Sequence, residues 1–104
     1  MFKTLKSLFV KDKTDYLKLI NQGAIILDVR NKEEFKKQHI KGSINIPLNN
    51  LQNNLHMLTE KSRAVITCCD TGLKSISAKS LLKINGYSNV YNGGVWQTLH
   101  NKLK

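Results

Sequence analysis

Residues 65–75 read VITCCDTGLKS, an apolar run that leads through a glycine-containing loop into a helix-compatible segment. Residues 64–68 are short, apolar and partly β-branched, which predicts a strand buried on both faces. Gly72 permits a tight loop, and residues 75–85 have helical apolar spacing with Gly86 as the natural stop. A buried strand followed directly by a helix is the repeating unit of a parallel sheet.

The same alternation extends along the rest of the chain. The other predicted strands are residues 24–29, 43–46 and 89–91, and residues 92–94 are predicted to form a turn of unusual φ. Four other helices are predicted from apolar spacing or capping residues. The residues that indicate them are Tyr16, Leu19 and Ile20 before Gly23; the capping pair Asn31 and Glu34; Leu48, Leu51, Leu55 and Leu58 after Pro47; and Val95, Trp96, Leu99 and Leu103. The pattern predicts an α/β fold, a small four- to five-stranded parallel sheet with helices on both faces.

Length and composition limit the possible classes of protein. The 104 residues are 40% apolar, which predicts one compact domain over residues 14–104 with an N-terminal extension over residues 1–13 that packs against it. We expect no membrane span, because no apolar run approaches about 18 residues. The net charge is +10, but the lysines are dispersed, which favours a solvated surface first and attraction of small anions second, and we expect no nucleic-acid partner.

The two cysteines, Cys68 and Cys69, are adjacent. Consecutive residues cannot easily reach disulfide geometry, so both are expected to be free thiols of a reducing compartment, the cytoplasm. The chain has no Cys-x-x-Cys pair, and its histidines are scattered, so no metal site is expected.

A thiol between a buried strand and a helix N-terminus lies among unpaired backbone N–H groups, which favour the thiolate. Gly72 allows these groups to converge, and Lys74 adds a positive charge. The alternative is that Cys68 and Cys69 are only small buried apolar residues at the end of a strand. The spacing Cys-x-x-Gly-x-Lys-Ser favours a functional loop.

The chain resembles the rhodanese family from about Tyr16 to Trp96. The motifs that carry the resemblance are Asp28-Val29-Arg30 with Glu34-Phe35; the run from His39 to Pro47; the loop from Cys69 to Lys74; Gly86-Tyr87-Ser88-Asn89-Val90; and Gly93-Gly94-Val95-Trp96. The resemblance implies a sulfurtransferase that holds a sulfane sulfur as a persulfide on Cys69 and needs no cofactor. The implied donor is a small anion such as thiosulfate, or a persulfide, and the implied acceptor is a thiol, cyanide or a protein.

The resemblance also assigns roles to other residues. The implied substrate-binding loop is Asp70, Thr71, Gly72, Leu73, Lys74 and Ser75, and the implied supports of the site are Asp28 and Arg30. The sequence departs from the family at two places. Lys74 stands where Arg is common, which keeps the charge but loses the bidentate fork. Asp70 puts a negative charge beside the nucleophile, which opposes the attraction of a dianion.

Two other functions stay open at the level of sequence. A cysteine phosphatase or arsenate reductase also attacks an oxyanion from such a loop, but it typically has Arg six residues after the nucleophile. Counted from Cys69 that residue is Ser75, and counted from Cys68 it is Lys74. The other alternative is a non-catalytic rhodanese-type module that binds a partner.

Overall fold

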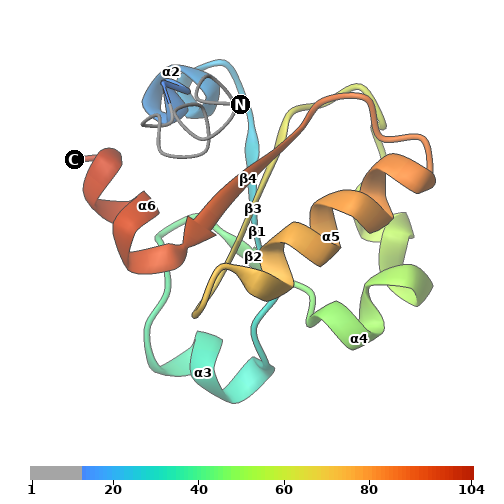
Figure 1. The fold of residues 1–104 in the computed structure, drawn as a ribbon, viewed down its shortest axis with the longest axis horizontal. Coiled ribbons are helices and arrows are strands. Elements are labelled where there is room, and N and C mark those ends of the chain that lie inside the picture. The colour runs from blue at the N-terminus through green and yellow to red at the C-terminus, as the bar shows by residue number, and fades with distance from the viewer. Residues whose placement is uncertain (1–12) are drawn as a thin grey trace, which may run out of the picture.

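A computed structural model of the chain describes residues 13–104 (Figure 1). Its strands are β1 (Ile25–Asp28), β2 (Ile44–Asn45), β3 (Val65–Cys69) and β4 (Val90–Val95). Its helices are α2 (Tyr16–Asn21), α3 (Lys32–Lys37), α4 (Leu48–Leu51), the 3-10 helix η1 (Gln52–Met57), α5 (Leu73–Ile84) and α6 (Trp96–Lys102). The strands form one parallel sheet in the order β2-β1-β3-β4, which confirms the predicted α/β class.

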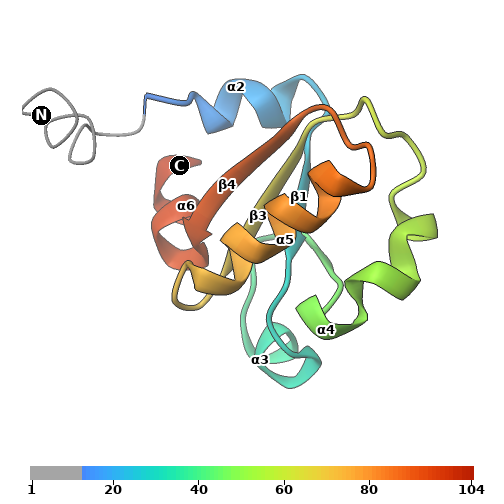
Figure 2. The same ribbon diagram turned by 45° about the vertical axis from the view of Figure 1, so that its right-hand side comes forward.

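The helices cover both faces of the sheet. Figures 1 and 2 show α2 and α6 together on one side and α4 and α5 on the other, while α3 follows the carboxyl end of β1. β1, β3 and β4 supply side chains to both layers, because successive residues of a strand point to opposite faces. Two apolar clusters result, one on each face of the sheet.

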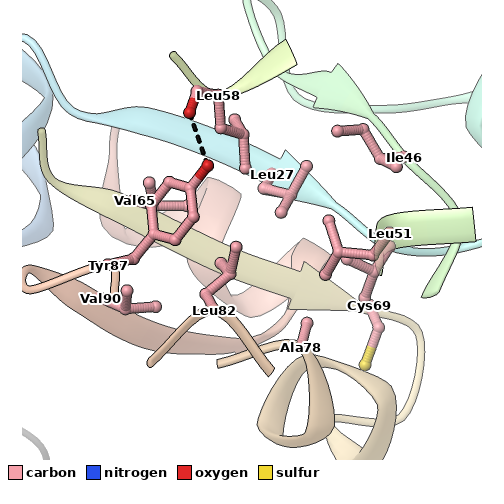
Figure 3. Packing of buried hydrophobic residues seen from close by; sticks show 11 residues of the cluster. Leu27, Ile46, Leu51, Leu58, Val65, Cys69, Ala78, Leu82, Tyr87 and Val90 are labelled. Atoms are coloured by element: carbon pink, nitrogen blue, oxygen red, sulfur yellow. Dashed lines mark hydrogen bonds between the residues drawn. The ribbon is translucent and has the colours of Figure 1, made fainter. Parts of the chain in front are cut away.

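The first cluster joins the sheet to α4 and α5 (Figure 3). Leu27 and Val65 from the strands meet Leu82 of α5, and all three side chains are fully buried. Tyr87 closes one end of the cluster, where its hydroxyl donates to the carbonyl of Leu58 at 2.6 Å. Cys69 belongs to this cluster, so the apolar core reaches the carboxyl edge of the sheet.

The second cluster joins the sheet to α2 and α6. Ile66 and Cys68 of β3 lie in it with Trp96 and Leu99 of α6. Cys68 and Cys69 are therefore on opposite faces of β3, although they are neighbours in the chain.

The turn predicted at residues 92–94 is wrong, because these residues belong to β4. Only Gly94 has the unusual backbone, with φ of +75°. Gly93 is buried, and a Cβ built on it would lie 2.8 Å from both Ile66 Cγ2 and the Thr67 carbonyl oxygen. A residue without a side chain is needed there because the strand runs so close to β3 and not because it turns.

The single helix predicted along residues 48–58 is also wrong. It divides into α4 and η1, and Asn54 inside η1 has φ of −124°, outside the helical region. Other boundaries differ by one or two residues, and two of these differences fall at the cysteine loop. Cys69 and not Cys68 is the last residue of β3, and α5 begins at Leu73, two residues before the predicted start.

The predicted N-terminal extension falls on residues 1–12, which lie outside the described residues, and on Lys13. The boundary between extension and domain thus stays a prediction. Over residues 13–104, no helix combines the length and the apolar character needed to cross a lipid bilayer.

Candidate active site

The loop between β3 and α5 forms at the carboxyl edge of the sheet, where ligands collect in open α/β folds. β3 ends at Cys69, and Gly72 precedes α5 with φ of +89°. This left-handed backbone is favourable only for glycine. It turns the chain so that the first N–H groups of α5 face back toward the cysteine.

Two backbone N–H groups donate to the Cys69 sulfur. The Gly72 nitrogen lies 2.9 Å from Sγ and the Ser75 nitrogen lies 3.3 Å from it. The Ser75 hydroxyl donates to the Gly72 carbonyl oxygen at 2.9 Å, and rotation of its hydrogen can serve the sulfur instead. The sulfur thus lies among donors whose positions are fixed by the loop and the first turn of the helix.

The donors decide the acidity of the thiol. Burial on its own raises the pKa of Cys69, but hydrogen bonds from the Ser75 side chain and from the backbone N–H groups of Ser75, Gly72 and Thr71 lower the pKa below its ordinary value. Hydrogen bonds to the charged form are the expected cause of such a shift. The loop therefore stabilises a thiolate at Cys69.

Cys68 has the opposite environment. Burial in the second cluster, together with the charge of Asp28, raises the pKa of the Cys68 thiol, and Arg30 opposes this only in part. A buried thiol with a raised pKa is unreactive. Of the two thiols, Cys69 is therefore the one whose surroundings favour the thiolate.

Asp28 and Arg30 form a buried ion pair beneath the site. They are 1% and 4% exposed, and Arg30 Nη2 lies 2.8 Å from Asp28 Oδ2. The same nitrogen donates to the Gln38 carbonyl at 2.7 Å, and the guanidinium carbon lies 4.7 Å from the ring centre of Trp96. The pair thus connects the end of β1 to the end of α3 and to α6.

The outer residues of the loop face solvent. Asp70, Thr71, Leu73 and Lys74 are exposed, whereas the Cys69 side chain is 0% exposed.

Two hollows flank the loop. One of about 310 Å³ lies on the Lys74 side and is walled by Val29, Pro47 and Leu48. The other, of about 330 Å³, lies on the Asp70 side and also contains Trp96. Lys74 is the one charged residue that lines the first hollow, whereas the second is lined by charges of both signs, Arg30, Glu34, Lys37 and Asp70.

Lys74 is a cation of the loop that forms no ion pair within the described part of the chain. Over residues 13–104 the one salt bridge is Arg30 with Asp28, so Lys74 has no carboxylate partner there. In the same residues no three His, Cys, Asp or Glu side chains form a group that could hold a metal ion.

Thr67 is a contributor that the sequence analysis missed. Its buried hydroxyl donates to the Ser75 carbonyl at 2.9 Å, which fixes the first turn of α5 against β3. A hydroxyl in an otherwise apolar strand is a polar group that must find a partner when buried, and this was the available signal.

We expect the alkylation rate of Cys69 to rise with pH through a midpoint below that of a free thiol, about 8.5. The reason is that the loop N–H groups stabilise the thiolate, so the reactive form is populated at lower pH. The measurement is iodoacetamide labelling against pH in a Cys68→Ser variant, followed by intact mass. A midpoint at or above that of a free cysteine peptide would contradict it.

Comparison with known proteins points to one family. The family profile of the rhodanese-like domain matches residues 12–95. The thiosulfate sulfurtransferase PspE of Escherichia coli is 35% identical over 69 residues, which cover 65% of this chain and 66% of that protein. A tRNA uridine(34) hydroxylase of Buchnera aphidicola is 32% identical over 95 residues, and the match covers 85% of this chain but only 30% of the hydroxylase.

Solved structures show the same fold. A rhodanese with anions from E. coli superposes with a TM-score of 0.67 at 31% identity, over 73% of this chain and 91% of that one. The human single-domain sulfurtransferase TSTD1 gives a TM-score of 0.70 at 23% identity, over 82% of this chain and 88% of that one, which shows the fold alone. The chain, with its cysteine loop between a buried strand and a helix, belongs to the rhodanese-like domain family.

Proposed function

We propose that this protein is a sulfurtransferase that carries a sulfane sulfur as a persulfide on Cys69 and passes it to a nucleophilic acceptor. The observation that carries the proposal is the position of Cys69 Sγ, which accepts hydrogen bonds from the N–H groups of Gly72 and Ser75. These donors can stabilise the negative charge of the Cys69 thiolate, which is the species that begins the reaction cycle and the species that is restored at its end. The sulfurtransferase names of several relatives support it.

The proposed chemistry has two steps. With thiosulfate, the Cys69 thiolate attacks the outer sulfur, a new S–S bond forms, and the bond to the sulfonate group breaks so that sulfite leaves with the electron pair. In the second step a thiolate, cyanide or a protein thiol attacks the outer sulfur of the persulfide. The bond to Sγ then breaks, and Cys69 returns to the thiolate that the loop stabilises.

The experiment that tests the proposal is intact-mass analysis after exposure to thiosulfate and to polysulfide. We expect the mass of one sulfur atom to be added and then removed by cyanide with formation of thiocyanate. No added sulfur from either donor would overturn the proposal. A cytoplasmic location is proposed with it, because a free nucleophilic thiol is preserved in a reducing compartment.

Phosphate chemistry has less support from the geometry. The residue six positions after Cys69 is Ser75, whose hydroxyl donates to the Gly72 carbonyl, so no guanidinium clamps an oxyanion there. We expect no useful hydrolysis of an aryl phosphate. Robust hydrolysis by the unmodified protein would favour the phosphatase alternative instead.

Lys74 is expected to select anionic donors. Lys74→Ala should lower kcat/KM for thiosulfate about tenfold, because a charge-assisted contact to the anion is lost, while use of a neutral persulfide donor should change little. Lys74 is exposed, so raising the ionic strength should reduce the difference. Steady-state kinetics with both donors make the measurement.

The control for Lys74 is Lys83→Ala, which removes the same charge from the last turn of the same helix. Lys74→Arg should preserve or improve thiosulfate use, since its fork can hold two oxygens. Equal losses on the two donors in Lys74→Ala would mean that Lys74 shapes the loop or tunes the thiolate.

A further inference from the structure

The outer face of α5 carries an unusual amount of exposed apolar surface. Five large apolar side chains are exposed among the described residues, and three of them, Leu73, Ile76 and Ile84, lie on this helix at 72%, 51% and 85% exposure. Their spacing places them on one side of the helix, with Ser80 between Ile76 and Ile84. The opposite side of α5 buries Ala78 and Leu82 against the sheet. We call the exposed set, Leu73, Ile76, Ser80 and Ile84, the α5 stripe.

The charges beside the α5 stripe all have one sign. By helical position Lys79 and Lys83 follow one flank and Lys74 the other, and the twelve residues of α5 include no Asp or Glu. In the described part of the chain these lysines form no salt bridge. An apolar stripe between free lysines is complementary to an apolar ridge flanked by carboxylates.

The α5 stripe begins at the nucleophile. Leu73, its first member, directly follows Gly72, whose N–H group lies 2.9 Å from Cys69 Sγ. Figures 1 and 2 show α5 on the outside of the molecule, running away from the loop with α4 at its side. A partner that lies along the helix therefore has one end at the sulfur.

We propose that the α5 stripe is the docking surface for an acidic protein that accepts sulfur from Cys69 on its own cysteine. This inference rests on the proposed function. The partner thiolate attacks the outer sulfur of the Cys69 persulfide, a new S–S bond forms on the partner, and Cys69 leaves as a thiolate with the electron pair. Contact along the helix raises the local concentration of that thiolate at the loop.

Other occupants fit the surface less well. A second copy of this chain would bring lysine-flanked stripes together in a protein of net charge +10, which is repulsive. An anionic membrane would match the charge, but it has no sulfur nucleophile to meet the loop at which the stripe begins. The position and the charge together favour a protein acceptor.

The test uses three synthetic helical peptides, each with one terminal cysteine. The first has a leucine ridge flanked by glutamates, the second has lysines in place of the glutamates, and the third keeps the glutamates but has glutamine in place of the leucines. Each is mixed with protein whose Cys69 has been loaded with sulfur, and single-turnover transfer is followed by mass. We expect the first peptide to react at least about tenfold faster than the other two, since only it satisfies both the apolar and the charged parts of the surface.

Variants separate docking from chemistry. Ile76→Ser/Ile84→Ser should remove the advantage of the first peptide and leave transfer to cyanide unchanged. Met57→Ser is the matched control, because Met57 is 49% exposed at the end of η1 and lines a hollow with Lys32 and Pro47 that includes no residue of α5, so this variant should keep the advantage. Lys79→Glu/Lys83→Glu should reverse the preference toward the basic peptide.

A second readout does not depend on sulfur transfer. Binding of fluorescent versions of the peptides with serine in place of cysteine, followed by anisotropy, should show the same order. Equal rates and equal binding for the three peptides would overturn the docking proposal while leaving the proposed function intact. Failure of the wild-type protein to transfer sulfur to cyanide would instead overturn the proposed function.

Two further results would assign the stripe to another occupant and overturn the proposal. One is a dimer in sedimentation that the Ile76→Ser/Ile84→Ser change dissociates. The other is binding to phosphatidylglycerol-containing vesicles that depends on the same two residues, without any preference among the peptides.

Discussion

Cys69→Ser is expected to abolish sulfur transfer and to remove the added sulfur mass, whereas Cys68→Ser should keep most of both. The serine hydroxyl is a far weaker nucleophile than the thiolate and cannot form a persulfide. Cys68 lies on the other face of β3, inside the second apolar cluster, with a raised pKa. The measurement is thiocyanate formation and intact mass for both variants beside the wild-type protein.

Both cysteine variants are expected to fold, because the serine side chain has only a slightly smaller volume than the cysteine side chain. Their circular dichroism and unfolding midpoints are therefore the control that a lost activity needs. Both cysteines lie in apolar clusters, but a hydroxyl at position 69 is next to the N–H donors of Gly72 and Ser75, so Cys68→Ser should be the less stable of the two. An active Cys69→Ser protein, or a folded but inactive Cys68→Ser protein, would show that the nucleophile has been assigned to the wrong residue.

Arg30→Met is expected to lower the free energy of unfolding by about 3–5 kcal/mol, because it leaves the Asp28 carboxylate buried without its charge partner. Arg30 donates to that carboxylate from Nε at 3.0 and 3.1 Å and from Nη2 at 2.8 Å. Urea unfolding measures the loss. Such a loss is a large fraction of the stability of a small domain.

The matched variant for Arg30→Met is Asp28→Leu/Arg30→Met, which removes both charges. We expect it to recover part of the lost stability, since no unpaired charge is then buried. Loss of the Arg30 contacts to Gln38 and Trp96 remains in both proteins. A loss below about 1 kcal/mol in Arg30→Met would show that the pair has little structural importance.

The parallel sheet could be predicted from the sequence because short apolar runs alternate with amphipathic segments. Residues 64–68 and 24–29 illustrate this, as both lie in the two central strands with their side chains in the two clusters. The strand at residues 89–91 was predicted, but the continuation of β4 through residues 92–95 was not. In a sequence, a glycine such as Gly93 is typical of a turn. In the structure, glycine is needed at this position because Ile66 and Leu99 lie within 2.9 Å of the point that a Cβ would occupy, and that approach depends on tertiary packing.

The loop shows a similar limit. A glycine and a helix N-terminus after a buried cysteine predict N–H groups that converge on the sulfur, and the N–H groups of Gly72 and Ser75 do point at it. The buried contact of Thr67 with Ser75 could not be derived, because it joins residues eight apart through a fold that only the structure defines. The division of residues 48–58 at Asn54 has no sequence signal that we can identify.

The opposite orientation of Cys68 and Cys69 has a consequence for oxidative damage. A peroxide that reaches Cys69 converts its thiolate to a sulfenic acid, and many redox-sensitive proteins protect that group with a second cysteine that resolves it. Cys68 cannot do so, because its side chain lies on the far face of the strand. An oxidised Cys69 must therefore be rescued by a thiol from another molecule before it advances to the irreversible sulfinic acid.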